Sequence, residues 1–593
     1  MDRMRRFATV IGILTAVLGS VPACVSDQVE DGADDGFPSG KADGGFDEGS
    51  PEALGVLSLV NDPSIAALEL RSAAGITSRV ATNIVTRRDG ADGVPGTADD
   101  NNFDTLAELD AVPYVGPATL NALVECARDR GLVRGAAKIE VVFSPQPAAQ
   151  SHNARIAQMI RDARFTVDIA MYSYSDAGIN AAIADAVTRG VKVRFLFDTA
   201  REDKNQVDPA VRAATKSGRL EAMGVDVRYV NKILHHKFAL VDGPRDDKAR
   251  AATAKIVTGS ANWSNSAATV FDENTLFIEG SAKLTASYQQ EFDLLWKGSR
   301  DFVGPAPVQA LSTANIDASQ VPEEAGLAVL LTRLNFTPTG SDGTTWSANK
   351  DKLVVSDQFV AAINRAETSI HVGSGHLRLR PVAEALVARK QANPALDIKV
   401  YLDQQEFISA SGDAFQRDRV ETCIASATTP AAVRDCSYNN FLFSKALVDA
   451  GIDVRFKSYA YRWDHSYAPQ MHSKYVIIDS KELLSGSYNL SMNAEHATFE
   501  NALHASGPQF EPLLAAFEQN FTTMWNTSRA GTELAALREQ IATASSIPLV
   551  FPSIALTYAE FDSLRALIRQ HCPLADSTEY RSAPAAHRFC PRS

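Results

Sequence analysis

Two short segments repeat one spacing of residues that could handle a phosphate: a histidine, a lysine two positions later and an aspartate five positions after the lysine. The two sets are His235, Lys237, Asp242 and His472, Lys474, Asp479. Residues two apart in an extended strand point to the same face, so each histidine shares a face with its lysine. The lysine can neutralise charge on phosphate oxygens, and the histidine can attack phosphorus or move a proton near neutral pH. The aspartates have the opposite parity, and we expect them to hold the end of the strand.

A turn of small residues and then a carboxylate follow each set. The turns are Gly259-Ser260-Ala261-Asn262 and Gly486-Ser487-Tyr488-Asn489, and the carboxylates are Glu273 and Glu500. The small residues allow a tight turn, and each asparagine amide can donate a hydrogen bond to a phosphate oxygen. His236 makes the first set ambiguous, but only His235 has both the lysine and the aspartate at the required positions. We therefore place His236 on the other face of the strand.

An alternation of strands and helices must position these residues. We predict strands at 165–172, 191–198 and 225–230 and a helix at 177–188. The order recurs downstream, with strands at 368–372, 397–403 and 451–456 and a helix at 381–390. The alternation predicts an α/β fold. Its recurrence, with the histidine sets in step, predicts a tandem duplication.

These patterns divide the chain into six parts. We predict a signal peptide at 1–24, a disordered acidic linker at 25–50, a helical module at 51–135, α/β domains at 136–305 and 325–530, and a C-terminal tail at 531–593. The first copy has extra residues before Gly259, including the charged run Arg245-Asp246-Asp247-Lys248, which we interpret as a surface-loop insertion. The tail contains one predicted helix, at 558–571, and nothing catalytic.

The repeated sets and turns resemble the signature of the phospholipase D superfamily, H-x-K-x4-D followed by G-S-x-N. The resemblance covers residues 137–528 in two copies, each with a Glu-Asn pair in step. It implies two tandem phospholipase D-like α/β domains packed as a pseudo-dimer, with one active site at the pseudo-twofold interface. Because both half-sites lie in one chain, we expect a monomer.

The resemblance also implies a role for each residue of the two sets. In this family one histidine attacks the phosphodiester and forms a phosphohistidine, while the other protonates the leaving alcohol. His235 would be the nucleophile and His472 the general acid, although the assignment could be reversed. The phosphate would be bound by Lys237, Lys474, Asn262, Asn489, Ser260 and Ser487. Glu273 and Glu500 would fix the tautomers of the histidines, and the mechanism needs no metal or cofactor.

The substrate class stays open at the level of the sequence. The family includes phospholipases, phosphatidyltransferases and nucleases. We favour hydrolysis of a phospholipid headgroup ester at a membrane surface, or transfer to an acceptor alcohol. An extracellular nuclease and a non-catalytic surface binding module are the alternatives. The aromatic segment 459–467, which we expect at the mouth of the site, could hold a headgroup, stack a base or pack as a loop, and no basic run with interleaved aromatics indicates a nucleic acid.

The N-terminus has the features of an export signal. Three arginines precede an apolar run at 7–18, which is too short to span a bilayer. Val21-Pro22-Ala23-Cys24 resembles a bacterial lipobox, so Cys24 is a candidate for lipidation, with plain secretion as the alternative. We expect a secreted, periplasmic or outer-surface bacterial protein. Export permits disulfides, and the locally spaced pairs are Cys423 with Cys436 and Cys572 with Cys590.

Residues 51–135 contain two turns, at 74–81 and 112–118, that resemble helix-hairpin-helix turns. In that family backbone N–H groups bind a nucleic-acid phosphate. Each turn here keeps one glycine, with Thr77 and Tyr114 at the other positions, so a spacer or protein-interaction role competes with DNA binding. The net charge of −13 does not indicate a nucleic-acid partner, although seven of these charges lie in residues 27–50.

Overall fold

The computed structural model describes residues 48, 50–95, 97, 99–130, 132–133, 137–303, 316–438, 441–543, 549–570, 572 and 577–585. These residues belong to two compact units, one containing Glu52–Val133 and the other Arg134–Ser593. The predicted signal peptide, with Cys24, lies outside the described residues, as do Cys590 and almost all of the predicted linker. None of the helices in the described part of the chain is long and apolar enough to span a membrane.

The N-terminal unit is helical, as predicted. Its helices are α1 (Pro51–Val60), α2 (Ala67–Ala74), α3 (Ser78–Arg88), α4 (Leu106–Asp110) and α5 (Pro117–Asp129). Gly75 follows α2 with φ 67°, and Tyr114 occupies the matching place before α5 with φ 73°. The Thr77 side chain caps α3 by accepting a hydrogen bond from the N–H of Val80. Both turns therefore keep a left-handed residue although each has lost a glycine; nucleic-acid binding by them stays a prediction.

The C-terminal unit contains two eight-stranded sheets whose strands follow the same order. The first is β1-β8-β7-β6-β2-β3-β4-β9 and the second is β10-β21-β18-β17-β13-β15-β16-β22. In each sheet the central strands are parallel and their flanking neighbours antiparallel. The same order in both sheets confirms the tandem duplication. We call residues 137–303 the first half and residues 316–585 the second half.

The strands have the following bounds. The first sheet consists of β1 (Lys138–Ser144), β2 (Thr166–Met171), β3 (Lys192–Phe197), β4 (Asp226–Tyr229), β6 (Lys237–Val241), β7 (Lys255–Gly259), β8 (Glu273–Glu279) and β9 (Arg300–Asp301). The second consists of β10 (Leu327–Leu331), β13 (Ser369–Ser374), β15 (Asp397–Asp403), β16 (Asp453–Ala460), β17 (Lys474–Ile478), β18 (Glu482–Gly486), β21 (Asn501–Ser506) and β22 (Val550–Thr557). Short pairs are β5 (Ile233–Leu234) with β20 (Thr498–Phe499), β11 (Phe336–Thr339) with β12 (Thr345–Ala348), and β14 (Leu377–Arg378) with β19 (Leu490–Ser491).

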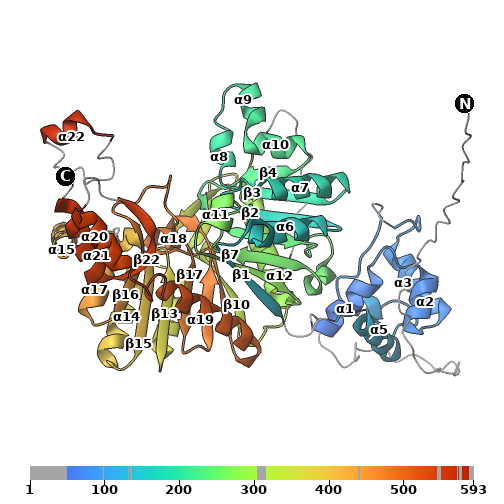
Figure 1. Ribbon diagram of the computed structural model, residues 1–593. Coiled ribbons are helices and arrows are strands. Elements are labelled where there is room, and N and C mark those ends of the chain that lie inside the picture. The colour runs from blue at the N-terminus through green and yellow to red at the C-terminus, as the bar shows by residue number, and fades with distance from the viewer. Residues whose placement is uncertain are drawn as a thin grey trace, which may run out of the picture. The chain divides into compact units, whose positions relative to one another are not determined.

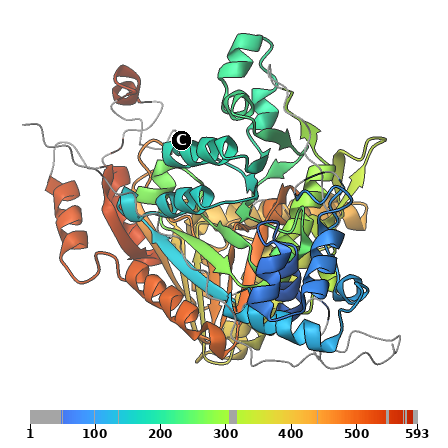
Figure 2. The ribbon, with the colours of Figure 1, turned by 90° about the vertical axis from the view of Figure 1, so that its right-hand side faces the viewer.

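Helices cover both sheets. The first half contains α6 (His152–Arg161), α7 (Ala177–Thr188), α8 (Ala200–Asp203), α9 (Pro209–Ala214), α10 (Lys216–Ala222), α11 (Asn265–Thr269) and α12 (Ala282–Lys297). The second contains α13 (Val354–Arg365), α14 (Arg380–Ala392), α15 (Ala410–Ser426), α16 (Pro430–Ser437), α17 (Ser444–Asp449), α18 (Met492–His496), α19 (Glu511–Trp525), α20 (Glu533–Thr543), α21 (Tyr558–Gln570) and α22 (Thr578–Ser582). In two views α9 and α10 stand out from the body of the first half (Figures 1 and 2).

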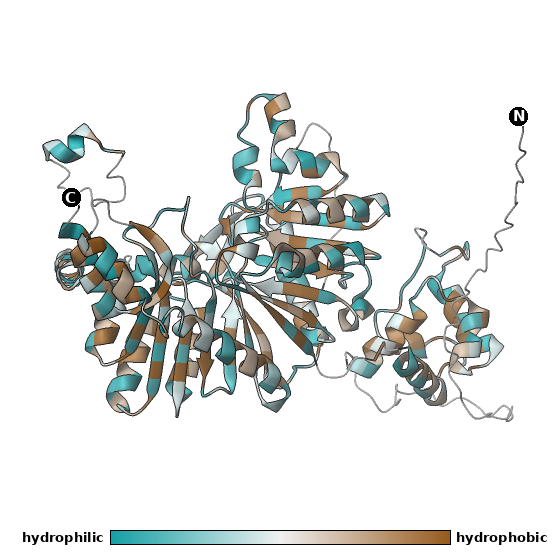
Figure 3. Ribbon diagram, viewed as in Figure 1, coloured by the Kyte–Doolittle hydropathy of each residue, from teal (hydrophilic) through white to brown (hydrophobic). Residues whose placement is uncertain are grey.

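The layers follow from the alternation of side chains along each strand. In β6, Ala239 and Val241 pack with α6 and α7 on the outer face of the first sheet. Phe238 and Leu240 point the other way, into a core that α12 and α19 share with both sheets. A third core covers the outer face of the second sheet with α13, α14, α20 and α21. The long brown stretches of the strands in Figure 3 mark these apolar faces. The two halves are thus joined through a common apolar core.

Most predicted elements of the α/β region are confirmed. The predicted helix at 177–188 is α7, and the predicted strand at 397–403 is β15. The boundary at 530 is wrong, because β22 pairs antiparallel with β16 and closes the edge of the second sheet. The helices α20 and α21 on either side of it contribute to the core of the second half. The predicted tail is therefore part of the second domain.

Candidate active site

The two histidines that were predicted to be catalytic lie immediately before equivalent strands, β6 and β17. The backbone N–H of His235 donates to the carbonyl oxygen of Phe499 at 3.0 Å. The backbone N–H of His472 donates to the carbonyl oxygen of Asp272 at 2.9 Å. Phe499 and Asp272 each precede a predicted orienting carboxylate. Each histidine is therefore fastened to the segment that carries the carboxylate of the opposite half.

The histidines and carboxylates pair across the interface between the halves. Nδ1 of His235 lies 2.7 Å from Oε1 of Glu500, and Nδ1 of His472 lies 2.6 Å from Oε1 of Glu273. Both carboxylates are buried, and burial raises the pKa of each to about 7. An ionised carboxylate can only accept a hydrogen bond, so Nδ1 carries the proton and Nε2 presents a lone pair to a substrate. The His472 contact is a hydrogen bond, whereas within the described residues Nδ1 of His235 is close to Glu500 without a hydrogen bond of regular geometry. The pairs are crossed between halves, and the orienting role of Glu273 and Glu500 stays a prediction.

The prediction that Ser260 and Ser487 bind phosphate is wrong. Both side chains are fully buried. The Ser260 hydroxyl donates to Oε2 of Glu273 at 2.6 Å, and the Ser487 hydroxyl donates to Oε2 of Glu500 at 2.7 Å. Each serine thus bonds to the carboxylate oxygen that does not contact the histidine. The small side chain is required because this residue sits between the turn and the carboxylate.

Lys237 and Lys474 are buried beside the histidines. Each ammonium donates to the carbonyl oxygen of its own histidine, at 2.8 Å for Lys237. Burial lowers the pKa of Lys237 to about 7 and that of Lys474 to about 8. An ammonium has three donors, so each lysine retains hydrogen-bonding capacity for a phosphate. Burial disfavours the charged form of both lysines, and a bound anion would offset this effect.

Asn262 and Asn489 follow β7 and β18 at equivalent places. Their Oδ1 atoms are buried and, within the described part of the chain, have no hydrogen-bond partner. The backbone carbonyl of Asn262 is 3.2 Å from Nε2 of the buried His152, which the sequence did not single out. Both asparagines therefore have unused hydrogen-bonding capacity at the site, although their binding of phosphate stays a prediction.

The aspartates at the far end of each set are props, as predicted. Asp242 accepts hydrogen bonds from the backbone N–H groups of residues 164–166, at 2.7 to 3.2 Å. Asp479 accepts them from residues 367–369, at 2.7 to 2.9 Å. Both aspartates have a φ of 53°. They fasten the start of β2 and β13 to the end of the histidine strand. This supports the role of props, although both aspartates belong to the predicted catalytic sets.

Two further aspartates hold the histidines from the other side. The N–H of Leu234, before His235, donates to Asp198 at 2.8 Å. The N–H of Met471, before His472, donates to Asp403 at 3.0 Å. Burial raises the pKa of both carboxyl groups to about 6. Both predicted strands end in an apolar residue followed by aspartate, and this shared ending is the sequence pattern that indicates the two aspartates.

His236 points to the opposite face from His235, as predicted. Its ring is fully buried, with Nε2 3.3 Å from Oε1 of Glu291. Its Nδ1 is 3.0 Å from Nδ2 of Asn501, the residue after Glu500. The equivalent Asn274 donates to the Ser485 hydroxyl at 2.8 Å. The asparagine after each carboxylate thus ties the two halves together.

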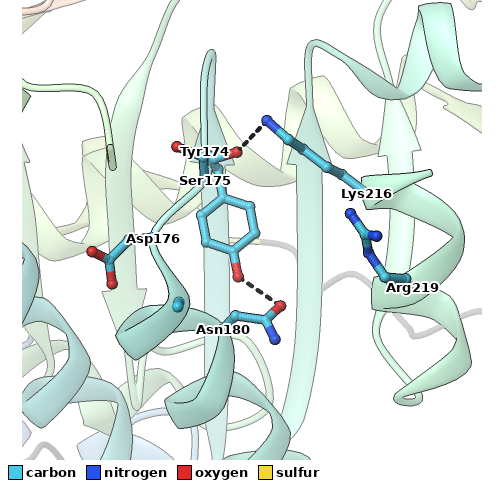
Figure 4. A pocket seen from close by; sticks show the side chains of 7 residues that line it. Tyr174, Ser175, Asp176, Asn180, Lys216 and Arg219 are labelled. Carbon is cyan, nitrogen blue, oxygen red and sulfur yellow. Dashed lines mark hydrogen bonds between the residues drawn. The ribbon is translucent and has the colours of Figure 1, made fainter. Parts of the chain in front are cut away.

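An aromatic side chain lies beside the first histidine. The Tyr172 ring lies 4.7 Å from the His235 ring. Two residues later in the chain, Tyr174 borders a separate cavity of about 260 Å³ that Lys216 and Arg219 also line (Figure 4). Lys216 donates to the carbonyl oxygen of Tyr174 at 2.8 Å.

The aromatic segment that was expected at the mouth is partly packed inside. Tyr459 is fully buried, and its hydroxyl donates to both oxygens of Asp403, at 3.1 and 3.0 Å. Tyr461 is also buried, whereas Trp463 and Tyr467 are partly exposed. The first part of the segment therefore supports Asp403, and only the second part keeps side chains that are partly exposed.

A known protein family matches both halves. The family model described as "Cardiolipin synthase, PLD-like domain" matches residues 156–296 and 359–525, one segment in each half. This chain belongs to the phospholipase D-like family. The matched segments contain both histidines, both lysines and both orienting carboxylates, so the family assignment and the crossed geometry concern the same residues.

The similar proteins include mitochondrial cardiolipin hydrolases. That of Danio rerio is 29% identical over 217 residues, which are 32% of this chain and 86% of the relative. That of Xenopus tropicalis is 28% identical over 155 residues, and the chain spans 65% of its length. The phosphatidylserine synthase from Haemophilus influenzae has 13% identity and a TM-score of 0.41, covering 76% of this chain and 93% of that one.

Proposed function

We propose that this phospholipase D-like protein is a phosphodiesterase that hydrolyses a phospholipid headgroup ester through a phosphohistidine intermediate. The observation that carries the proposal is the crossed pairing, in which two histidines and two lysines from separate halves share one site. A single phosphodiester could then be approached by a nucleophile from one half and an acid from the other. Because both half-sites lie in one chain, the active species is a monomer.

In the first step Nε2 of His235 attacks phosphorus, and the bond from phosphorus to the leaving alcohol oxygen breaks. Protonated His472 donates its Nε2 proton to that oxygen. In the second step neutral His472 takes a proton from water, and the hydroxide attacks phosphorus. The phosphorus–nitrogen bond breaks, and both histidines return to their starting states. Lys237 and Lys474 stabilise the negative charge on the non-bridging oxygens throughout.

The electrostatics of the empty site suit the first step. Burial and the neighbouring Lys237 and Lys474 hold the pKa of both histidines well below its usual value, so His235 is neutral and nucleophilic. A bound phosphodiester brings a negative charge that offsets the lysines and raises the pKa of His472 toward the value a general acid needs. Substrate binding thereby enables His472 to act as the general acid.

A phospholipid substrate is supported by the cardiolipin hydrolases among the relatives. The test compares vesicles of phosphatidylcholine or diphosphatidylglycerol with plasmid DNA, all in the presence of a chelator. We expect lipid hydrolysis that survives chelation and no cleavage of the plasmid. Plasmid cleavage with intact lipid would replace the proposal with a nuclease, and failure to turn over either would leave a binding module.

The intermediate has its own test. Lipid labelled with ³²P at the scissile phosphate is incubated for a long time with the His472→Ala variant. This variant lacks the acid of the first step, so the phosphohistidine forms slowly, and it lacks the residue that activates water, so the phosphohistidine persists. We expect acid-labile label on the protein, and none on the His235→Ala variant. Label that persists in His235→Ala and disappears in His472→Ala would reverse the two roles.

We also propose that the protein acts outside the cytoplasm. The disulfide between Cys423 and Cys436 supports this, because such bonds persist in oxidising compartments. Cys572 is also disulfide-bonded, but its predicted partner lies outside the described residues. Fractionation of expressing cells, with palmitate labelling to detect lipid on Cys24, tests the location. Recovery of unlabelled protein in the cytoplasm with reduced cysteines would contradict it.

A further inference from the structure

The loop after β13 in the second half differs sharply from its first-half counterpart. The two loops leave their sheets in the same way, since Tyr172 N–H donates to the carbonyl of His236 and Gly375 N–H donates to that of Ser473, both at 3.0 Å. Ser173 of the first half therefore corresponds to His376 of the second. The first-half loop carries uncharged side chains here, whereas the second-half loop carries a histidine and an arginine.

One buried carboxylate organises that histidine and arginine. Oε1 of Glu406 lies 2.9 Å from Nδ1 of His376 and accepts from Arg378 at 2.9 Å (Nε) and 2.7 Å (Nη2). Oε2 of Glu406 accepts from the backbone N–H of Leu377 at 3.1 Å. The Glu406 side chain is 1% exposed, while those of His376 and Arg378 are 28% and 27% exposed. The carboxylate thus fixes two groups that can be cationic at the surface of the site.

The pair borders the catalytic machinery on two sides. Gly375, just before His376, lies so close to the second catalytic histidine that a Cβ added to it would be 3.4 Å from the Cα of His472. Leu377, just after His376, pairs with Leu490, which follows the predicted phosphate-binding Asn489. The loop is therefore held between the general acid and one phosphate-binding residue.

Each side chain keeps one nitrogen that can contact a ligand. With Nδ1 directed at Glu406, the remaining ring nitrogen of His376 is Nε2, and within the described residues it has no protein partner. The same holds for Nη1 of Arg378. Nη1 of Arg378 is a permanent donor, and an imidazole donates from both nitrogens only when it is protonated. Guanidinium groups suit phosphate and carboxylate oxygens.

We propose that His376 and Arg378 form a binding subsite for a second negatively charged group, carried by the leaving alcohol of the substrate. The inference rests on the proposed function, in which His472 protonates the leaving alcohol, because the subsite adjoins His472 and not His235. The second group is a phosphate or a carboxylate. The preferred substrates are then phospholipids whose headgroup is itself anionic.

Two matched pairs of lipids isolate the second charge. Diphosphatidylglycerol loses an alcohol that bears a phosphate, while phosphatidylglycerol loses neutral glycerol. Phosphatidylserine loses an alcohol that bears a carboxylate, while phosphatidylethanolamine lacks it. All four are presented at one low mole fraction in uncharged detergent micelles, so that surface charge stays constant. The wild-type protein should have a higher kcat/KM for the anionic member of at least one pair.

The variants are His376→Gln and Arg378→Gln, with Arg569→Gln as control because its side chain is exposed on α21. We expect each of the two subsite variants to lower the anionic-to-neutral ratio of kcat/KM about tenfold, mainly through KM, as for loss of a hydrogen bond to a charged group. The neutral lipids and the control should be affected less than twofold. A lower ratio in the diphosphatidylglycerol pair identifies the bound group as a phosphate. A lower ratio in the phosphatidylserine pair identifies it as a carboxylate.

Two results would overturn the subsite. One is an unchanged ratio in folded variants, judged by unaltered Tm. The other is a wild-type protein that hydrolyses both members of each pair equally, which needs no variant to fold. A wild-type protein inactive on all four lipids would instead refute the proposed function, and with it the subsite.

Discussion

In the first half Lys237 begins β6 and Asp242 ends the set, and Lys474 and Asp479 hold the same places in the second half. The backbone contacts of His235 and His472 also match, down to the aspartate that holds the preceding residue. Around this shared frame the halves diverge. The first half places Tyr172 against its histidine, whereas the second places His376 and Arg378 beside its own.

The two halves also differ in the polar and charged side chains at equivalent positions of β2 and β13. In the first half Arg194 bonds to Asp168 and Asp293 at 2.6 and 2.7 Å, and Arg245 reaches the same Asp168 at 2.9 Å. At the place of Asp168 the second half has His371, which lies 2.7 Å from Glu518. A carboxylate in the first half is thus replaced by an imidazole in the second. The comparison indicates that the backbone frame of the two half-sites is constrained while the polar side chains that support it can be exchanged.

The largest effect should come from removing either histidine. We expect His235→Ala and His472→Ala each to reduce phosphodiesterase activity by about 10³-fold or more, since nucleophile and acid serve one reaction. Steady-state hydrolysis of a chromogenic phosphodiester measures the loss. If the halves were independent sites, each single variant would instead retain about half of the activity.

The next effect tests the unequal buried layers. Arg245→Met should reduce the free energy of unfolding by about 3–5 kcal/mol, because it leaves Asp168 with one fewer cationic partner in a fully buried network. Denaturant unfolding measures it. The control is Arg250→Met on the same insertion, whose contact with Asp247 is 3.8 Å and partly exposed. Equal, small losses for both variants would contradict a structural role for Arg245.

The strand-end props should respond alike in the two halves. Asp242→Asn and Asp479→Asn should each destabilise the protein by about 1–3 kcal/mol, because an amide has one accepting oxygen and no charge for the backbone N–H groups. We expect near-normal kcat in the folded protein, measured well below Tm. A loss of kcat comparable to that of a histidine variant would show that an aspartate takes part in catalysis.

The smallest effect concerns pH. The orienting carboxyl groups, with pKa about 7, must be ionised, so kcat/KM should fall as the pH drops below about 7. The lysines must be protonated, so kcat/KM should fall as the pH rises, first through the pKa of Lys237 near 7 and then through that of Lys474 near 8. Because two groups titrate on each limb, the acid limb should approach about a hundredfold per pH unit, and the alkaline limb about tenfold per unit between the two lysine pKa values and about a hundredfold above both. Lys237→Arg should move the alkaline limb upward, and Lys474→Arg should leave it in place.

Local patterns were sufficient to predict the elements and the two half-sites. The spacing of His472 and Lys474 fixes which side chains share a strand face, and the order of strands repeats the order of the patterns. The crossing of Glu273 and Glu500 could not be predicted, because it depends on how the two halves meet. The serines were misassigned for the same reason, since their partners became visible only once the carboxylates were placed.

Contacts between residues that are far apart in the sequence also made two predictions wrong. Arg245 lies in a charged run that is typical of a surface loop, but it is buried because Asp168, far away in the sequence, accepts from it. β22 was missed because an edge strand in a Pro- and Ser-containing segment has little apolar alternation of its own. Both are cases in which a tertiary contact outweighs the local signal.

The central claim is that each histidine works with the carboxylate of the other half. ¹⁵N NMR of labelled histidines reports the tautomer and pKa of His235 and His472 separately, once each is assigned by substitution. The crossed geometry predicts that Glu273→Gln changes the Nδ1 signal of His472 and spares His235, and that Glu500→Gln does the reverse. A change confined to the histidine of the same half in each variant would contradict the crossed site.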